Sequence, residues 1–282
     1  MHAGLSEFIA VLDRATTGVA VEAGHPEQSL FFILDQQAVQ DIQAQIFAAD
    51  ETVEPIQLYQ GPDFEHLAES GPLWFSAPPG GALQHLGETL CQEQAAGIAV
   101  IAADGQAALA HARGLLQVND GSGGQSLITY YRPDVWPALA LTASEGLFGP
   151  WHGVHSPAPR HIGAKPGQWL EWHADGAASS SSISARYSLT PSTQPTCRTL
   201  RWLYWVDGYY QAFNSPAPAQ LPALLDNLEL LVEHGINEGR WLVKLADLSS
   251  RGPLSEREAV MAVLRGKTEP FIKVEQLQAL AP

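Results

Sequence analysis

A glycine-rich segment, Asp120-Gly121-Ser122-Gly123-Gly124, holds a serine on what could be a tight, exposed turn. A nucleophilic serine needs a base beside it and an oxyanion hole, both held rigidly. The segments on either side predict only the tip of a hairpin, and glycine separates the aspartate from the serine. We therefore interpret the segment as a flexible turn, and we expect the chain to have no catalytic residues and not to be an enzyme.

Four histidines, His152, His155, His161 and His173, lie within 22 residues, and Asp175 follows them. Histidine with carboxylate partners is a common ligand set for zinc and similar metals. A metal-dependent hydrolase using these four histidines is therefore an alternative function. Against it, the region has neither the helix that fixes H-E-x-x-H ligands on one face nor a CxxC pair. Solvent-exposed histidines in a loop are the simpler interpretation.

A second alternative comes from aromatic side chains in the second half of the chain. They are Trp169, Trp172, Trp202, Trp205, Tyr209 and Tyr210. Such rings stack on sugars, so a carbohydrate-binding module is one interpretation; they also fill cores and dominate protein interfaces. The sequence contains no Walker loop, no GxGxxG and no GxSxG, so nucleotide and α/β-hydrolase chemistry have no support.

The net charge of −15 is unevenly distributed along the chain. Residues 1–150 hold 18 acidic and three basic residues, whereas residues 151–282 hold 12 of each. No Lys or Arg occurs between Ala15 and Ala112. This acidity disfavours nucleic acid and anionic lipid as partners. Either it keeps the lobe soluble, or it binds a partner with a basic face, in which case binding should weaken as salt rises.

Cysteine content and hydropathy indicate the compartment. The two cysteines, Cys91 and Cys197, are too few for a disulfide framework, so a reducing cytoplasm is expected. No run of 18 apolar residues predicts a membrane span, and the first residues do not form a secretory signal. We expect a cytoplasmic protein with no cofactor and no membrane partner.

The apolar patterning predicts an N-terminal α/β (α+β) lobe that has a mixed sheet and flanking helices. Apolar runs bounded by polar residues predict strands, at 29–34, 55–59, 71–76 and 97–102. Apolar residues three and four apart predict helices, at 36–48, 83–90 and 107–116, and Asp63 is a candidate N-cap of a further short helix. A glycine-rich loop between 116–118 and 127–131 predicts a hairpin.

The second half of the chain has a different composition. Residues 151–196, rich in Gly, Pro, Ser and His, predict a connecting region with short strands at 168–172 and 185–189. The aromatic residues of 201–212 predict a strand running into a turn, and the pattern is helical from Pro218 onward. The predicted domains are an N-terminal extension, an α/β lobe, this connecting region and a mainly α-helical C-terminal lobe, at 1–28, 29–150, 151–196 and 197–282.

Short landmark segments follow one another in a characteristic order through the first lobe. They are Phe32-Ile33-Leu34-Asp35, Pro55-Ile56-Gln57-Leu58-Tyr59, Leu67-Ala68-Glu69-Ser70-Gly71-Pro72-Leu73-Trp74, Gly97-Ile98-Ala99-Val100, Tyr130-Tyr131-Arg132-Pro133-Asp134-Val135 and Leu147-Phe148-Gly149-Pro150. The series resembles the adaptor or effector-chaperone family of bacterial type VI secretion systems. The resemblance covers about residues 29–150, with weaker similarity in the C-terminal helices, and it depends on the order of the segments.

The resemblance implies a non-catalytic adaptor or chaperone. Such a protein binds a toxin effector and helps to load it onto the spike protein of the secretion system. It also implies that partner-binding residues lie among the landmarks. The candidates are Asp35, Tyr59, Trp74, Tyr131, Arg132, Asp134, Trp136 and Phe148.

One landmark departs from the family pattern. The family usually has Arg-Phe-Tyr-Asp-Pro-Arg-Val where this chain has Thr129-Tyr130-Tyr131-Arg132-Pro133-Asp134-Val135. The acidic and basic positions around the proline are exchanged, and the first arginine is a threonine. An ion pair of reversed polarity is expected between Arg132 and Asp134. It either contributes to partner choice or only joins strand to helix.

Overall fold

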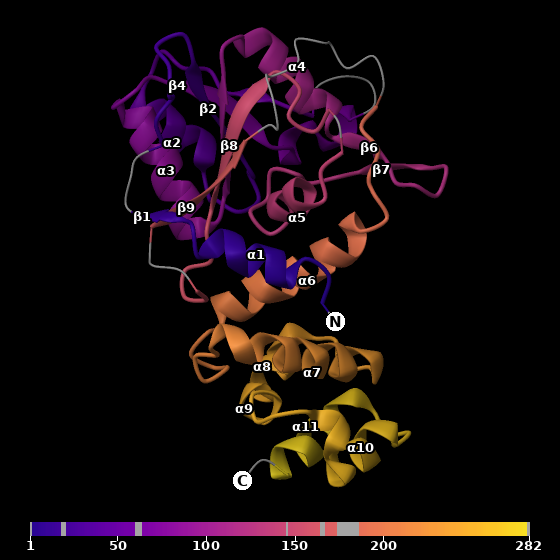
Figure 1. Ribbon diagram of the computed structural model, residues 1–282. Coiled ribbons are helices and arrows are strands. Elements are labelled where there is room, and N and C mark those ends of the chain that lie inside the picture. Colours follow the sequence, from indigo (N-terminus) through magenta and orange to yellow (C-terminus); the bar gives the residue numbers. More distant parts are fainter. Residues whose placement is uncertain are drawn as a thin grey trace.

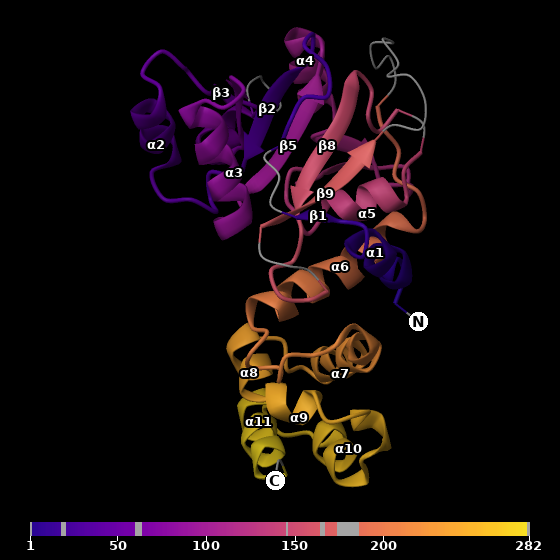
Figure 2. The same cartoon turned by 60° about the vertical axis from the view of Figure 1, so that its left-hand side comes forward.

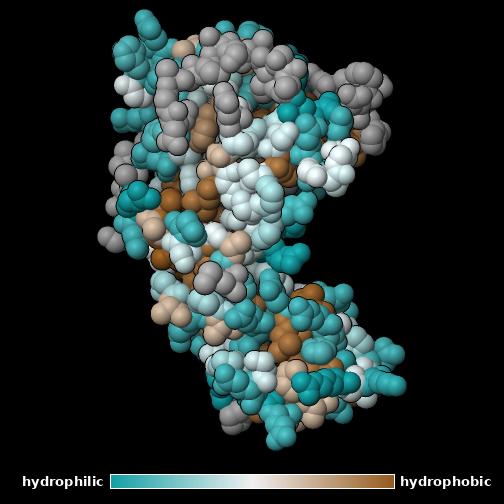
Figure 3. All heavy atoms as spheres, turned by 45° about the vertical axis from the view of Figure 1, so that its right-hand side comes forward, coloured by the Kyte–Doolittle hydropathy of each residue, from teal (hydrophilic) through white to brown (hydrophobic). Residues whose placement is uncertain are grey.

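The computed structural model describes residues 2–17, 21–59, 64–144, 146–163, 167–173 and 186–280. Figure 1 shows a sheet lobe, a helical lobe at the C-terminal end, and helix α6 (Thr193–Gly208) between them. In Figure 3 the outline of the molecule is hollowed between the two lobes. We use "sheet lobe" for the described residues of 16–173 and "helical lobe" for 218–280.

Seven of the described strands of the sheet lobe form one sheet in the order β1-β9-β8-β5-β2-β4-β3, and the other two, β6 (Gln117–Asn119) and β7 (Gln125–Leu127), pair with each other. The bounds of the seven strands are Thr16–Thr17 (β1), Ser29–Leu34 (β2), Ile56–Gln57 (β3), Leu73–Ala77 (β4), Gly97–Ala102 (β5), Trp151–Pro157 (β8) and Gln168–His173 (β9). The predicted class, an α+β lobe followed by a mainly helical region, is confirmed.

The sheet is antiparallel at every described pairing, so the prediction of a mixed sheet is wrong in this detail. Strands β4 and β5 run parallel, as their connection through α3 (Ala82–Gln94) leads one to expect. Strand β2 lies between them and pairs antiparallel with both. The two parallel strands of this strand-helix-strand unit are therefore separated by β2 and do not pair with each other.

The two faces of the sheet pack against different layers because side chains alternate along each strand. In β2, Phe32 and Leu34 pack with α2 (Ile42–Ala49) and α3, whereas Phe31 and Ile33 belong to the larger core cluster on the opposite face. That larger cluster includes α4 (Gly105–Gly114) and α5 (Trp136–Leu141). Figure 2 shows α2 and α3 together on one side of the sheet.

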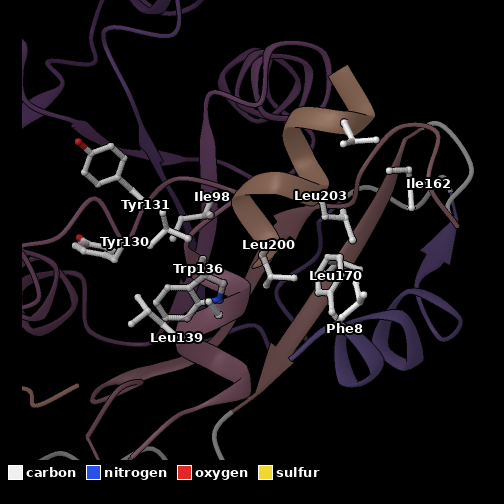
Figure 4. Packing of buried hydrophobic residues seen from close by; sticks show 14 of the residues in the cluster. Phe8, Ile98, Tyr130, Tyr131, Trp136, Leu139, Ile162, Leu170, Leu200 and Leu203 are labelled. Atoms are coloured by element: carbon white, nitrogen blue, oxygen red, sulfur yellow. The ribbon is translucent and has the colours of Figure 1, made fainter. Parts of the chain in front are cut away.

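Helix α6 replaces the strand that the aromatic residues of 201–212 predicted. Leu200, Leu203 and Val206 are fully buried at helical spacing, and this face packs into the larger core cluster. Figure 4 shows Leu200 and Leu203 beside Leu170 of β9 and Phe8 of α1 (Leu5–Leu12). The high strand propensity of Trp and Tyr was misleading here, because tertiary packing of the leucine face determines the structure.

The region predicted as a connector supplies strands to the sheet. Strand β8 pairs with β5, β9 pairs with β8, and β1 from the N-terminal segment pairs with β9. The predicted strand at 168–172 is confirmed as β9. The predicted strand at 185–189 lies partly outside the described residues, and within them Ser188 forms an isolated bridge with Asn119. The domain boundaries at 150 and 196 stay a prediction.

Shorter elements complete the sheet lobe. The predicted hairpin is present as β6 (Gln117–Asn119) paired with β7 (Gln125–Leu127), but the prediction of its second strand at 127–131 is wrong, because β7 ends at Leu127. A 3₁₀ helix, η1, spans Glu65–Ser70, and the predicted N-cap Asp63 lies outside the described residues. Asp104 caps α4 by accepting hydrogen bonds from the backbone N–H groups of Gln106 and Ala107, at 2.9 and 3.0 Å.

The helical lobe follows α6. Its elements are η2 (Pro218–Gln220), α7 (Leu221–Glu233), α8 (Gly239–Lys244), α9 (Ala246–Ser249), η3 (Leu254–Glu256), α10 (Glu258–Arg265) and α11 (Pro270–Ala279). Buried leucines of α7 belong to the same core cluster as α6, so one hydrophobic core runs from the sheet into the helical lobe. Within the described part of the chain, no helix has the length and apolar character needed to cross a bilayer.

Candidate functional site

The glycine-rich turn is held by its aspartate. Asp120 accepts hydrogen bonds from the Ser122 backbone N–H at 2.9 Å, the Ser122 hydroxyl at 2.6 Å and the Ser126 hydroxyl at 2.9 Å. These bonds, that from the Ser122 hydroxyl first, lower the pKa of Asp120 to about 2. The Ser122 hydroxyl therefore donates its proton to a weakly basic carboxylate, which is the role of a turn residue rather than of an activated nucleophile.

The structure brings three of the four candidate metal ligands together. His152, His155 and His173 line a pocket of about 560 Å³ between the 21–28 segment and strands β8 and β9. His161 lies elsewhere and stacks on Tyr210, with 5.2 Å between ring centroids. Among the described residues, no group of three His, Cys, Asp or Glu side chains is placed to hold a metal ion. Asp175 is outside the described residues.

The interpretation of these histidines as loop residues is wrong for His152, His155 and His173, which lie in strands β8 and β9, and the expected exposure is wrong for His155. His155 lies in β8 with 7% of its surface exposed. Burial lowers the pKa of His155 to about 4, so the imidazole is neutral at pH 7. His155 is buried because β8 lies inside the sheet, between β5 and β9. The Gly- and Pro-rich composition of the region did not predict this strand.

The aromatic residues divide into two groups. Trp169 and Trp172 are buried in the sheet lobe, and the Trp172 indole N–H donates to the Ser156 hydroxyl at 2.9 Å. Trp202 and Trp205 of α6 and Tyr209, which follows the end of that helix, form a row with ring centroids 5.4 and 5.2 Å apart. Their planes are inclined at 81° and 50°, so these rings do not form the flat platform on which a sugar would stack.

Most of the aromatic landmarks proposed for partner binding lie in the core. Tyr59, Trp74, Tyr131 and Trp136 are each at most 5% exposed. The Tyr59 and Tyr131 hydroxyls lie 3.5 Å apart, and burial raises the pKa of both groups. Phe148 is half-buried against Trp136, with 5.8 Å between ring centroids. These five side chains pack in the interior of the sheet lobe, and their role in partner binding stays a prediction.

The three charged landmarks, in contrast, line one groove. Asp35, Arg132 and Asp134 lie in a cavity of about 1170 Å³ bounded by α6, the C-terminal end of α3, and the loops at 132–134 and 157–160. We call this cavity the α6 groove. Arg160, Arg198 and Arg201 also line it, so four of the chain's 15 basic residues meet there.

The walls of the groove are joined by buried polar contacts. The Asp207 carboxylate, 5% exposed, accepts hydrogen bonds from the backbone N–H groups of Arg160, His161 and Ile162, at 2.7, 2.8 and 2.9 Å. The Tyr204 hydroxyl donates to the Pro157 carbonyl at 3.0 Å. Two α6 residues thus fix the loop that follows β8, and the groove has a defined shape.

The predicted ion pair of reversed polarity is present. The Arg132 guanidinium donates two hydrogen bonds to Asp134, at 3.0 and 3.1 Å, and Arg201 Nε lies 3.8 Å from the same carboxylate. Partial burial works against the charged form of Arg132, but the charge and hydrogen bonds of Asp134 outweigh it and raise the pKa. The Arg132–Asp134 pair therefore connects the sheet lobe to α6, because Asp134 also contacts Arg201 of that helix.

Sequence reasoning missed Arg160, Arg198 and Arg201. A signal for α6 was present, since Gln194, Arg198, Arg201, Trp202 and Trp205 repeat at helical spacing and share one face. The two cysteines also line the groove, and both are free thiols. Burial raises the pKa of Cys197 to about 11 and that of Cys91 further, so neither is an activated nucleophile.

Comparison with known families gave one match. Residues 30–146 match the family described as a domain of unknown function (DUF4123). The matched region is less than half of the chain. It contains β2 to β5, α5 and the charged landmarks, and it ends before β8 and α6. Neither the curated proteins nor the solved structures contain a match to this chain.

Proposed function

We propose that this chain is a non-catalytic adaptor that binds a toxin effector and helps to load it onto the spike protein of a bacterial type VI secretion system, in the cytoplasm. The observation that carries the proposal is the family match over residues 30–146. It falls on the stretch, about 29–150, in which the ordered landmarks resemble the adaptor family of these systems.

The distribution of surface chemistry supports a binding role. The α6 groove is open and combines arginine with tryptophan, and these two residue types dominate the energetics of protein interfaces. In the described part of the chain, the serine turn and the two thiols each have a structural explanation. Binding rather than chemistry is the function that this arrangement favours.

Co-expression tests the proposal directly. The full chain, with an affinity tag, is produced together with the effector and the spike protein encoded beside its gene. We expect both to co-purify with the tagged chain, while the spike protein of an unrelated secretion cluster does not. If neither neighbour co-purifies at low salt, the proposal is wrong.

A further inference from the structure

We infer that the α6 groove binds an extended segment of a partner protein through acidic side chains of that segment, which pair with Arg160, Arg198 and Arg201. The identity of the partner as an effector or spike protein rests on the proposed function. The chemistry of the segment rests on the groove alone.

The arginines of the groove have hydrogen-bond donors to spare. Arg198 is exposed and has no hydrogen bond or ion pair with any described residue. Arg160 uses its Nε to donate to the Gln92 carbonyl at 3.1 Å, and its terminal nitrogens have no partner among the described residues. Arg201, 63% exposed, has one distant contact, 3.8 Å to Asp134. A guanidinium carries five donors, so a ligand rich in acceptors is required to satisfy them.

The carboxylates of the groove are already occupied. Both oxygens of Asp207 accept backbone N–H groups, and both oxygens of Asp134 accept from Arg132. Asp35 accepts from the Gln37 backbone N–H at 2.9 Å. Glu93 is the lining carboxylate without a hydrogen bond among the described residues. The lining has equal numbers of acidic and basic residues. Most of the hydrogen-bonding groups that remain unpaired among them are arginine donors, and carboxylates of a ligand would accept from these donors.

The size and the aromatic lining indicate a peptide rather than a small metabolite. At about 1170 Å³ the groove exceeds the roughly 300–1,000 Å³ of small-molecule sites. Trp202 and Trp205 line it, half-buried, next to the arginines of α6. Such rings provide apolar contact area for the side chains between the acidic ones.

Nucleic acid is the other class of anionic macromolecule, and the charge of the chain disfavours it. Residues 1–150 hold 18 acidic and three basic residues, and parts of this segment, at 35–38, 91–95 and 132–134, line one wall of the groove. A polyanion that extends beyond the groove meets this negative surface and loses the affinity gained at the arginines. A short acidic segment of a protein avoids most of that repulsion.

The test is a binding titration with the full-length protein and defined probes. The probes are a short fluorescent peptide rich in Asp, Glu and Leu, the same peptide with Asn and Gln in place of the acids, and a short single-stranded DNA. We expect the acidic peptide to bind by fluorescence anisotropy, and the amide peptide and the DNA to bind at least about tenfold more weakly.

Variants locate the binding site. Arg198→Gln with Arg201→Gln should weaken binding of the acidic peptide at least about tenfold, since each substitution removes charge-assisted hydrogen bonds. The matched control is Arg240→Gln with Arg265→Gln, two exposed arginines of the helical lobe, which should bind like the parent. Arg198→Lys with Arg201→Lys keeps the charge and should bind with intermediate affinity. Thermal unfolding of each variant reports whether it is folded.

The outcomes separate this inference from the proposed function. Equal binding of acidic and amide peptides, tighter binding of DNA, or full binding by the folded Arg198→Gln/Arg201→Gln variant would overturn the inference. If that variant still co-purifies with the neighbouring effector, the adaptor function stands and the groove is not its site. If the acidic peptide binds in the groove but neither neighbouring protein co-purifies, the groove chemistry stands and the adaptor function fails.

Discussion

The landmark aromatics of the sheet lobe and the arginines of the α6 groove differ in burial and in what they contribute to this protein. Tyr131 and Trp136 are almost fully buried and shape the lobe, while Arg198 and Arg201 are exposed and carry little of its stability. The ordered series that resembles a family consists mostly of residues of the first kind. A resemblance that depends on buried residues therefore predicts the fold. The residues that bind a partner have to be inferred from the surface of the folded protein.

Trp136→Ala should have the largest effect on stability. Trp136 has no exposed surface and contacts Tyr130, Phe148 and Trp151, with ring centroids 6.4, 5.8 and 5.8 Å apart. Its removal leaves a cavity, so urea unfolding should show a loss of about 3–5 kcal/mol. Trp136→Phe is the control: the indole N–H has no hydrogen-bond partner among the described residues, so the smaller ring should cost less. A loss below about 1 kcal/mol for the alanine variant would contradict the scaffold role.

Protonation of two buried histidines should destabilise the protein in acid. Burial lowers the pKa of His111 and of His155 to about 4, and the unfolded chain has the ordinary value near 6.5. Between these two pKa values the unfolded state binds more protons than the folded state. The free energy of unfolding is therefore at its full value above about pH 6.5 and decreases as the pH falls towards 4. Each histidine should contribute roughly 3 kcal/mol at most over this window.

Urea unfolding at pH 7.0 and at successively lower pH measures this loss, with pH spacing chosen inside the window. His155→Gln should reduce the slope of stability against pH, and His85→Gln, at an exposed position of α3, should leave it unchanged. Equal slopes for the two variants would show that His155 is not buried in its neutral form.

Asp207→Ala should reduce both the stability of the protein and peptide binding in the α6 groove. The carboxylate is buried and accepts three backbone N–H groups, so its loss should cost about 2–3 kcal/mol in urea unfolding. Asp207→Asn keeps one oxygen acceptor and should cost less. Because Asp207 fixes the backbone of Arg160, both variants should also weaken peptide binding, which a purely peripheral residue would not do.

Reversal of the landmark ion pair should have the smallest effect. Arg132→Asp with Asp134→Arg gives the order of charges usual in the adaptor family that the landmarks resemble, and a partly exposed pair should change stability by less than about 1 kcal/mol. The exchange is not neutral, however, because it places a second guanidinium, at position 134, beside that of Arg201. Adding Arg201→Glu should recover the loss in thermal unfolding, and a failure to do so would show that Arg201 is not coupled to this pair.

The sequence predicted the centre of the sheet well and the groove poorly, for a physical reason. The apolar runs of β2 and β5 are buried on both faces, so their pattern alone determines strands. The aromatic residues of α6 have strand propensity, and only the leucines that face the core make the segment helical. The groove depends on contacts of Asp134 and Arg160 with α6. These residues are far apart in the chain, so no local sequence pattern predicted the groove.

The position of β8 has a consequence for any shortened version of the protein. All six residues of β5 are buried, and β8 pairs along one edge of this strand while β2 pairs along the other. The region matched by the family ends at residue 146, just before β8. A fragment cut there would leave the long apolar edge of β5 open to other chains, which is the situation that leads to aggregation through edge pairing. The smallest unit that protects this edge extends at least to Pro157, beyond the limits of the family itself.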